Sequence, residues 1–203
     1  PNDPGHPAAV AALAGRCARA LGGRTFVLTT TLRALQAVAE QLRADFQCHG
    51  DSIEVLQQGQ SSKRQLLQQF LAQPRSVLVG SQSFWEGIDV PGDALQCVLI
   101  DKLPFPPPND PLVQARVQRL EAQRRNAFTE YFVAEAAVSL KQGAGRLIRR
   151  ETDRGLLVVC DPRMTTMSYG KRLRAALPPM SLVTTEAQAL EWLSLLGAAD
   201  LPY

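Results

Sequence analysis

Hydrophobic residues gather along this chain in short runs that are separated by longer segments of mixed character. Five runs rich in β-branched and aliphatic residues predict strands at residues 24–29, 52–56, 76–80, 96–100 and 156–160. The segments between and after them predict helices at residues 32–45, 63–73, 110–125, 129–150 and 165–176. The strand runs are apolar almost throughout, as in parallel strands that helices cover on both faces. We therefore expect an α/β fold with an open, mostly parallel sheet flanked by helices.

The two ends of the chain carry weaker signals. Residues 186–196 predict one more amphipathic helix after a proline pair, so we divide the chain into a main domain at 1–180 and a short helical tail at 181–203. The tail could pack on the domain or dock a partner, and we favour packing. We interpret the first five residues, which show no apolar leader, as the cut edge of a longer protein.

Composition excludes several classes of protein. With 203 residues, 45% hydrophobic and 20% charged, the chain is neither disordered nor fibrous. The net charge is only +3, but arginines and lysines cluster at residues 146–154 and 171–174. No run approaches the roughly 20 apolar residues of a membrane span.

The spacing of the four cysteines matches neither a zinc ribbon nor an iron–sulfur run. We expect reduced core thiols in a cytosolic protein at Cys17, Cys48, Cys97 and Cys160.

Polar residues follow four of the predicted strands. Ligands of open parallel sheets bind beyond the carboxyl ends of the strands, so these residues are candidates for a binding site. They are Thr29, Thr30 and Thr31, then Ser81 and Ser83, then Asp101 and Lys102, and finally Asp161 and Arg163. For Thr30 and Asp161 a helix cap or turn is an equally good interpretation. Asp3 and Asp110, each followed by proline, predict further helix starts.

The strongest cluster of candidate residues lies at 142–149. Helical spacing of about 100° per residue would place Gln142, Arg146 and Arg149 on one face. The opposite face is apolar, at Phe132, Val133, Ala136, Ala137, Leu140, Ala144, Leu147 and Ile148. An amide beside two guanidinium groups suits a phosphate chain. The alternative is a solvated face, or pairing of these arginines with Glu135, Glu151 or Asp153.

Other phosphate and catalytic motifs are absent from the sequence. The one Gly-Lys pair, at 170–171, precedes arginine, so there is no phosphate-binding loop of the Gly-x-x-x-x-Gly-Lys-Ser/Thr type, and no Asp-Glu dipeptide occurs. We place His6 in a leading segment and His49 in a loop, and neither forms a nucleophile–base arrangement.

Residues 81–89, 101–105, 142–149, 161–163 and 169–171 together resemble the second RecA-like motor domain of the DinG and XPD group of superfamily-two DNA helicases. The match runs from about residue 24 to residue 179, and it is most similar to the bacterial YoaA-type branch. The resemblance implies an ATP-dependent helicase that moves five-prime to three-prime on single-stranded DNA in repair or replication.

The resemblance also implies roles for individual residues. Gln142, Arg146 and Arg149 fall on motif six, which reaches ATP across the interdomain cleft, with both arginines as arginine-finger candidates. Glu86, Gly87 and Asp89 fall on motif five, which couples the nucleotide site to DNA. Thr29, Thr30 and Thr31 occupy the motif-four region and are expected to contact DNA, as are Ser81 and Ser83.

By the same resemblance, ATP, Mg²⁺ and an iron–sulfur cluster belong with a first motor domain of the same protein. We expect this chain to bind no cluster, to fold alone and to hydrolyse nothing by itself. Its expected partners are single-stranded DNA, the first motor domain and, through the tail, a replication or repair protein, in the bacterial cytoplasm at the nucleoid. The alternatives are a non-motor module that recruits such a protein, and a small-molecule α/β enzyme with an anionic substrate.

Overall fold

The structure is a computed structural model that describes residues 3–81, 84, 90, 92–148 and 152–199, and it does not describe the side chain of Arg146. Its centre is a five-stranded sheet in the order β2-β3-β1-β4-β5. Every pairing is parallel. The strands are β1 (Thr25–Thr29), β2 (Glu54–Gln57), β3 (Ser76–Ser81), β4 (Cys97–Ile100) and β5 (Leu156–Val159). Each lies within two residues of its predicted bounds, so the predicted α/β fold is confirmed.

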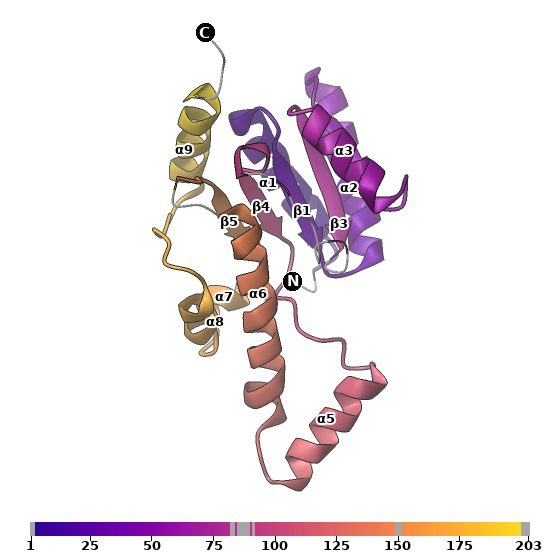
Figure 1. Cartoon of the computed structure of the whole chain (residues 1–203), viewed down its shortest axis with the longest axis vertical. Coiled ribbons are helices and arrows are strands. Elements are labelled where there is room, and N and C mark those ends of the chain that lie inside the picture. Colours follow the sequence, from indigo (N-terminus) through magenta and orange to yellow (C-terminus); the bar gives the residue numbers. More distant parts are fainter. Residues whose placement is uncertain (1–2, 82–83, 85–89, 91, 149–151, 200–203) are drawn as a thin grey trace.

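Helices cover both faces of the sheet (Figure 1). Along β1, Val27 points to one apolar cluster, whereas Phe26 and Leu28 point to the other. The first cluster includes α1 (His6–Leu21), α2 (Leu32–His49) and α9 (Glu186–Ala199). The second includes α3 (Lys63–Ala72) and α6 (Val133–Leu147). Burial on both faces explains why the strand sequences are apolar throughout.

The connection between β4 and β5 carries the remaining helical elements of the middle of the chain. It contains α5 (Pro111–Ala122) and a π-helical turn, η2 (Phe128–Phe132), which leads into α6. In Figure 1, α5 and the first turns of α6 extend away from the sheet. The predicted start of α5 is confirmed, because the Asp110 side chain accepts hydrogen bonds from the N–H groups of Leu112 and Val113. A short 3₁₀ turn, η1 (Gly92–Ala94), precedes β4.

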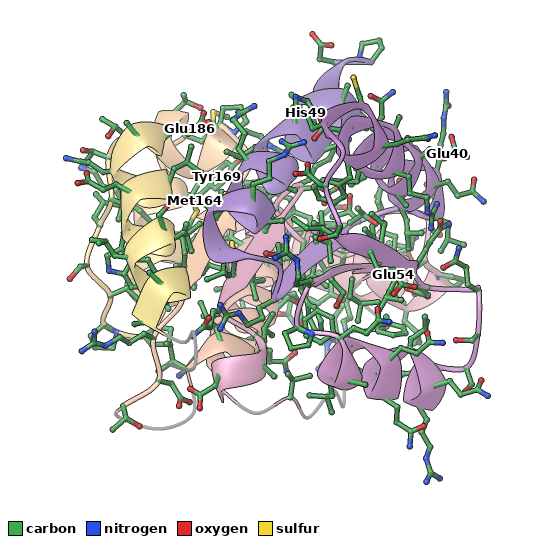
Figure 2. All side chains as sticks on the ribbon, turned by 90° about the horizontal axis from the view of Figure 1, so that it is seen from above. Glu40, His49, Glu54, Met164, Tyr169 and Glu186 are labelled. Atoms are coloured by element: carbon green, nitrogen blue, oxygen red, sulfur yellow. The ribbon has the colours of Figure 1, made fainter. Side chains whose placement is uncertain are left out.

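The sequence analysis predicted a helix start at Asp3 but gave the first helix no bounds. His6, which we placed in a leading segment, is the first residue of α1. Asp3 is not the cap of this helix, since Gly5 precedes its first residue and the first-turn proline is not Pro4. His49, which we placed in a loop, is the last residue of α2 (Figure 2).

Several predicted helices have different bounds in the structure; α2, for example, runs four residues beyond its predicted end at residue 45. The helix predicted to reach residue 150 ends at Leu147, because Ile148 is extended and returns the chain toward β5. The helix predicted at 165–176 is two short helices, α7 (Arg163–Thr166) and α8 (Gly170–Ala176). A Cβ at Gly170 would lie 2.2 Å from the carbonyl oxygen of Met164, so the two helices meet more closely than any other residue would allow.

The helix of the tail, α9, packs on α1. Its Leu193 is fully buried in the same cluster as Val10 and Ala14 of α1, and Glu186 pairs with Arg16. Figure 2 shows α9 beside α1, with Glu186 in its first turn. Packing of this helix is therefore confirmed, while the division at residue 180 stays a prediction.

The four cysteines are free thiols. Cys17 and Cys97 are buried as expected and Cys160 is half-buried, but Cys48 is exposed on α2, so the prediction of a core thiol is wrong there. Among the described residues, no group of three or more His, Cys, Asp or Glu side chains is arranged to hold a metal ion, and no helix is long and apolar enough to span a membrane.

Candidate nucleotide and DNA interface

The carboxyl ends of the strands bring the predicted site residues together. In the parallel register Thr29 at the end of β1 lies opposite Ser81 at the end of β3. Leu28 of β1 lies opposite Ile100, directly before Asp101 at the end of β4. The sheet order therefore places the threonine loop between Ser81 and Asp101, although these residues are far apart in the sequence.

The three threonines have different roles in the structure. The Thr29 side chain is buried, with its hydroxyl 3.2 Å from the carbonyl oxygen of Thr31. Thr30 donates its backbone N–H and its hydroxyl to Asp101, at 3.0 and 3.3 Å. Thr31 is exposed and caps α2, because its hydroxyl accepts the N–H of Ala34 at 3.1 Å. The cap predicted as an alternative for Thr30 is therefore formed by the next residue, Thr31.

Thr31 is well placed to meet an anion. A threonine hydroxyl that accepts one hydrogen bond keeps its own proton to donate. The exposed Thr31 stands at the N-terminus of an 18-residue helix, where backbone N–H groups and the helix dipole favour negative charge. Its neighbour in the first turn, Arg33, is also exposed. The arrangement suits a phosphate group that approaches the end of β1.

Asp101 is a buried carboxylate, only 1% exposed, at the end of β4. Its Oδ1 accepts the N–H groups of Thr30 at 3.0 Å and Lys102 at 2.6 Å. Burial raises the pKa of the Asp101 carboxyl above its ordinary value, and these donors oppose the rise. Its carbonyl oxygen lies 2.8 Å from Nε2 of His6, so the start of α1 also reaches this edge.

Asp161, at the end of β5, is bound on both oxygens. Oδ2 accepts the N–H of Leu103 at 2.9 Å, and Oδ1 accepts the N–H of Arg163 at 3.0 Å. The Arg163 guanidinium pairs with the same carboxylate at 2.6 Å and lies 5.4 Å from the ring centroid of Phe105. Although burial acts to raise it, the pKa of Asp161 is lowered, because the Arg163 side chain and these N–H groups favour the charged form. The turn interpretation therefore describes Asp161 well.

On α6 the predicted apolar face is confirmed. Val133, Ala136, Leu140, Ala144 and Leu147 are buried, whereas Gln142 is exposed. Arg146 lies in the last turn of α6, and Arg149 lies outside the described residues. Because the helix ends at Leu147, helical spacing does not place Arg149 on the face of Gln142. Glu135 pairs with Arg116 of α5 at 3.5 Å.

The glycines of this segment differ in their surroundings. Gly143 is buried, whereas Gly145 is exposed and a Cβ there would meet no described atom within 4 Å. A glycine inside a helix costs on the order of 1 kcal/mol relative to alanine. No close approach among the described residues explains Gly145.

The remaining predicted site residues lie after β3. Ser81 donates its backbone N–H to Oε1 of Gln58 at 2.7 Å. Ser83, Glu86, Gly87 and Asp89 lie outside the described residues. The sequence analysis missed two residues at the carboxyl ends of the strands, His6 and Gln58. Motif spacing along the sequence could not identify them, because each reaches this edge of the sheet from a distant segment.

Comparison with known proteins gives the family. The helicase C-terminal domain family matches residues 15–180. The ATP-dependent DNA helicase YoaA of Escherichia coli is 42% identical over 194 residues, which is 96% of this chain and 30% of YoaA. The ATP-dependent helicase DinG of Mycobacterium tuberculosis is 44% identical over 181 residues, 89% of this chain and 26% of DinG. The 3′-5′ exonuclease DinG of Bacillus subtilis is 34% identical over 170 residues, 83% of this chain and 18% of that protein.

Solved structures agree on the fold. An XPD helicase has a TM-score of 0.57 at 21% identity, over 78% of this chain and 28% of that one. Xpd4 of S. tokodaii has a TM-score of 0.59 at 16% identity, over 85% of this chain and 34% of that one. The chain spans about a third or less of the length of these relatives. Because the family covers most of the chain and the resemblance to DinG and YoaA helicases is confirmed, the chain belongs to the helicase C-terminal domain family.

Proposed function

We propose that this chain is the second motor domain of an ATP-dependent five-prime to three-prime DNA helicase that acts in bacterial DNA repair or replication, in the cytoplasm at the nucleoid. A first motor domain of the same protein would hold ATP and Mg²⁺ and carry the iron–sulfur cluster. This chain would supply Gln142, Arg146 and Arg149 to the phosphates of ATP. By itself it would bind DNA weakly and hydrolyse nothing.

The observation that carries the proposal is the polarity of α6. One face of the helix is locked into the core by five buried residues, which fixes the direction of the other face. That other face presents the exposed Gln142 and the uncrowded Gly145, and Arg146 follows within the same turn. These features support the approach of a second domain to α6 at the residues that we propose to meet ATP.

The DNA contacts would come from the carboxyl ends of β1 and β3. Of the three threonines, Thr31 is the exposed one and stands at the start of α2, so it is the strongest candidate for a phosphate contact. Thr29 and Thr30 would support the loop, because their hydroxyl groups bond within the protein. Ser81 and Ser83 would extend the contact, and Glu86, Gly87 and Asp89 would couple it to the nucleotide.

The test is DNA-stimulated ATPase activity of the full-length enzyme with Arg146→Ala. In the proposed mechanism, ATP binding would close the two motor domains and bring the arginines to the phosphoryl group that is transferred. Hydrolysis would then release this contact between the arginines and ATP. Loss of an arginine finger is expected to lower kcat by roughly two orders of magnitude or more. Lys141→Ala, at an exposed cation of the same helix, is the matched control and should leave the rate unchanged. An unchanged rate in Arg146→Ala, with ATP and DNA still bound, would contradict the proposed role.

Recruitment of a replication or repair protein is the alternative function, and α9 is where it would occur. Leu195 is 67% exposed on α9 and Trp192 is 36% exposed, while Leu193 is held in the core. Recruitment that required Leu195 and Trp192 but survived Arg146→Ala would favour a non-motor module. ATPase activity that required Arg146 and survived Leu195→Ala would favour the motor.

A further inference from the structure

Asp101 joins three separate segments at the edge of the sheet. Its carboxylate holds Thr30, 71 positions away in sequence, through two hydrogen bonds. The same carboxylate holds the N–H of Lys102, the next residue of its own loop. Its backbone carbonyl meets the ring of His6, 95 positions away, at the start of α1. The start of α1, the threonine loop and the loop after β4 therefore share one anchor.

The anchor is a costly group to bury. A carboxylate with 1% exposure loses hydration, and the hydrogen bonds of this site recover only part of that loss, because the pKa of Asp101 stays raised. A plain turn at this position needs no buried charge. The three donors that Asp101 binds are the N–H and hydroxyl of Thr30 and the N–H of Lys102, and all of them lie in loops at the proposed DNA interface.

The geometry points to Asp101 as a positioning residue for DNA binding, an inference that rests on the proposed function. By fixing both donors of Thr30, Asp101 sets the direction of the next residue, Thr31, and of the first turn of α2. Asp101 itself does not touch DNA, since its oxygens point inward and are occupied. His6 is a secondary anchor, and it lies before the part of the chain that the family matches.

The variants follow from the hydrogen bonds. Asp101→Ala removes every side-chain bond of the anchor. Asp101→Asn keeps Oδ1 for the two N–H donors, and the Thr30 hydroxyl can turn to accept from the new Nδ2, so this variant is the matched rescue. Thr30→Val removes one donor and keeps the volume of the side chain, and it remains informative if Asp101→Ala folds poorly.

The experiment measures the Kd of the full-length enzyme for a fluorescein-labelled 20-nucleotide oligo(dT), with the KM for ATP at saturating DNA as a second readout. We expect Asp101→Ala to weaken DNA binding about tenfold and Thr30→Val about threefold, with Asp101→Asn within about twofold of wild type. The KM for ATP should not change. In a Thr31→Val background Asp101→Ala should lose most of its effect, because both changes act on one contact.

Three results would overturn the inference. They are an unchanged Kd in folded Asp101→Ala and Thr30→Val, full additivity with Thr31→Val, and an Asp101→Asn variant as weak as Asp101→Ala. In each of them the wild-type enzyme still binds oligo(dT), so the proposed function stands. A wild-type enzyme that does not bind oligo(dT) at all would instead refute the proposed function.

Discussion

Replacing Asp161 by alanine tests how the loops at the sheet edge are held. The change leaves the N–H of Leu103, a residue only 3% exposed, without its acceptor. An unsatisfied buried donor costs about 1–3 kcal/mol. The Arg163 side chain is 34% exposed and can be hydrated, so loss of the ion pair adds only about 1 kcal/mol. We expect Asp161→Ala to lower the free energy of unfolding by about 2–4 kcal/mol.

Urea unfolding followed by far-ultraviolet circular dichroism measures this loss, with m as the check on two-state behaviour. For a chain of this size the same loss corresponds to a fall in Tm of roughly 5–15 °C. Asp110→Ala is the matched control, because Asp110 also accepts two backbone N–H groups but caps an outlying helix, and it should cost about 1 kcal/mol. A loss below 1 kcal/mol in Asp161→Ala at unchanged m would refute the reasoning, since Leu103 would then have another acceptor.

Comparing the free energy of unfolding of wild type and Asp161→Asn at different pH values tests whether the charge on Asp161 stabilises the fold. The folded-state pKa of Asp161 is lowered, so its ionised form stabilises the protein above the unfolded-state pKa of about 4. This contribution is lost as pH falls through the lower folded-state pKa. The stability difference between wild type and Asp161→Asn should therefore be constant from pH 5 to 7 and shrink below about pH 4. A difference that grew on acidification would contradict the assigned direction.

Three further predictions address the core and the surface. Leu193→Ala should cost about 2–4 kcal/mol in urea unfolding because it leaves a cavity between α9 and α1, whereas Leu195→Ala, at a 67% exposed position, should change stability by less than about 0.5 kcal/mol. Gly23→Ala should prevent stable folding, seen as loss of the cooperative thermal transition, because Gly23 has φ +117° and a Cβ there would lie 2.2 Å from the carbonyl oxygen of Pro74. The Cys48 thiol should react with Ellman's reagent in the native protein at pH 8, and the other three thiols only on unfolding, because they are buried or half-buried.

The strands could be predicted from the sequence because each is a self-contained apolar run. A parallel strand covered on both faces leaves no polar position to confuse the pattern, and β3 and β4 read as nearly continuous aliphatic stretches. The apolar face of α6 was predictable for a similar reason, since its buried residues recur at helical spacing. The sequence does not give the order of the strands. In the structure β1 lies next to β4, and this places Thr30 beside Asp101.

The failures have physical causes. The Asp-Pro pair at residues 3–4 predicts the start of α1 too early, because the Asp3 carboxylate accepts the N–H of Gly5 in a turn before the helix, which begins at His6. The end of α6 depends on a distant requirement. Its last residue, Leu147, packs against Gly155 just before β5, where a Cβ would lie 2.4 Å from the Leu147 side chain. Residues that meet from distant segments, such as His6 and Asp101, carry no local signal.

The chemical character of the sheet edge depends on which of its polar groups are already bonded within the protein. Asp101 and Asp161 lie at adjacent strand ends, and their carboxylate oxygens are occupied by N–H groups, a hydroxyl and a guanidinium. What faces outward there is the start of α2, with the Thr31 hydroxyl and the unpaired N–H groups of a helix N-terminus. Among the residues that the structure describes here, hydrogen-bond donors are therefore presented to a ligand. Such an edge favours phosphate groups, which supports the proposed contact with a DNA backbone.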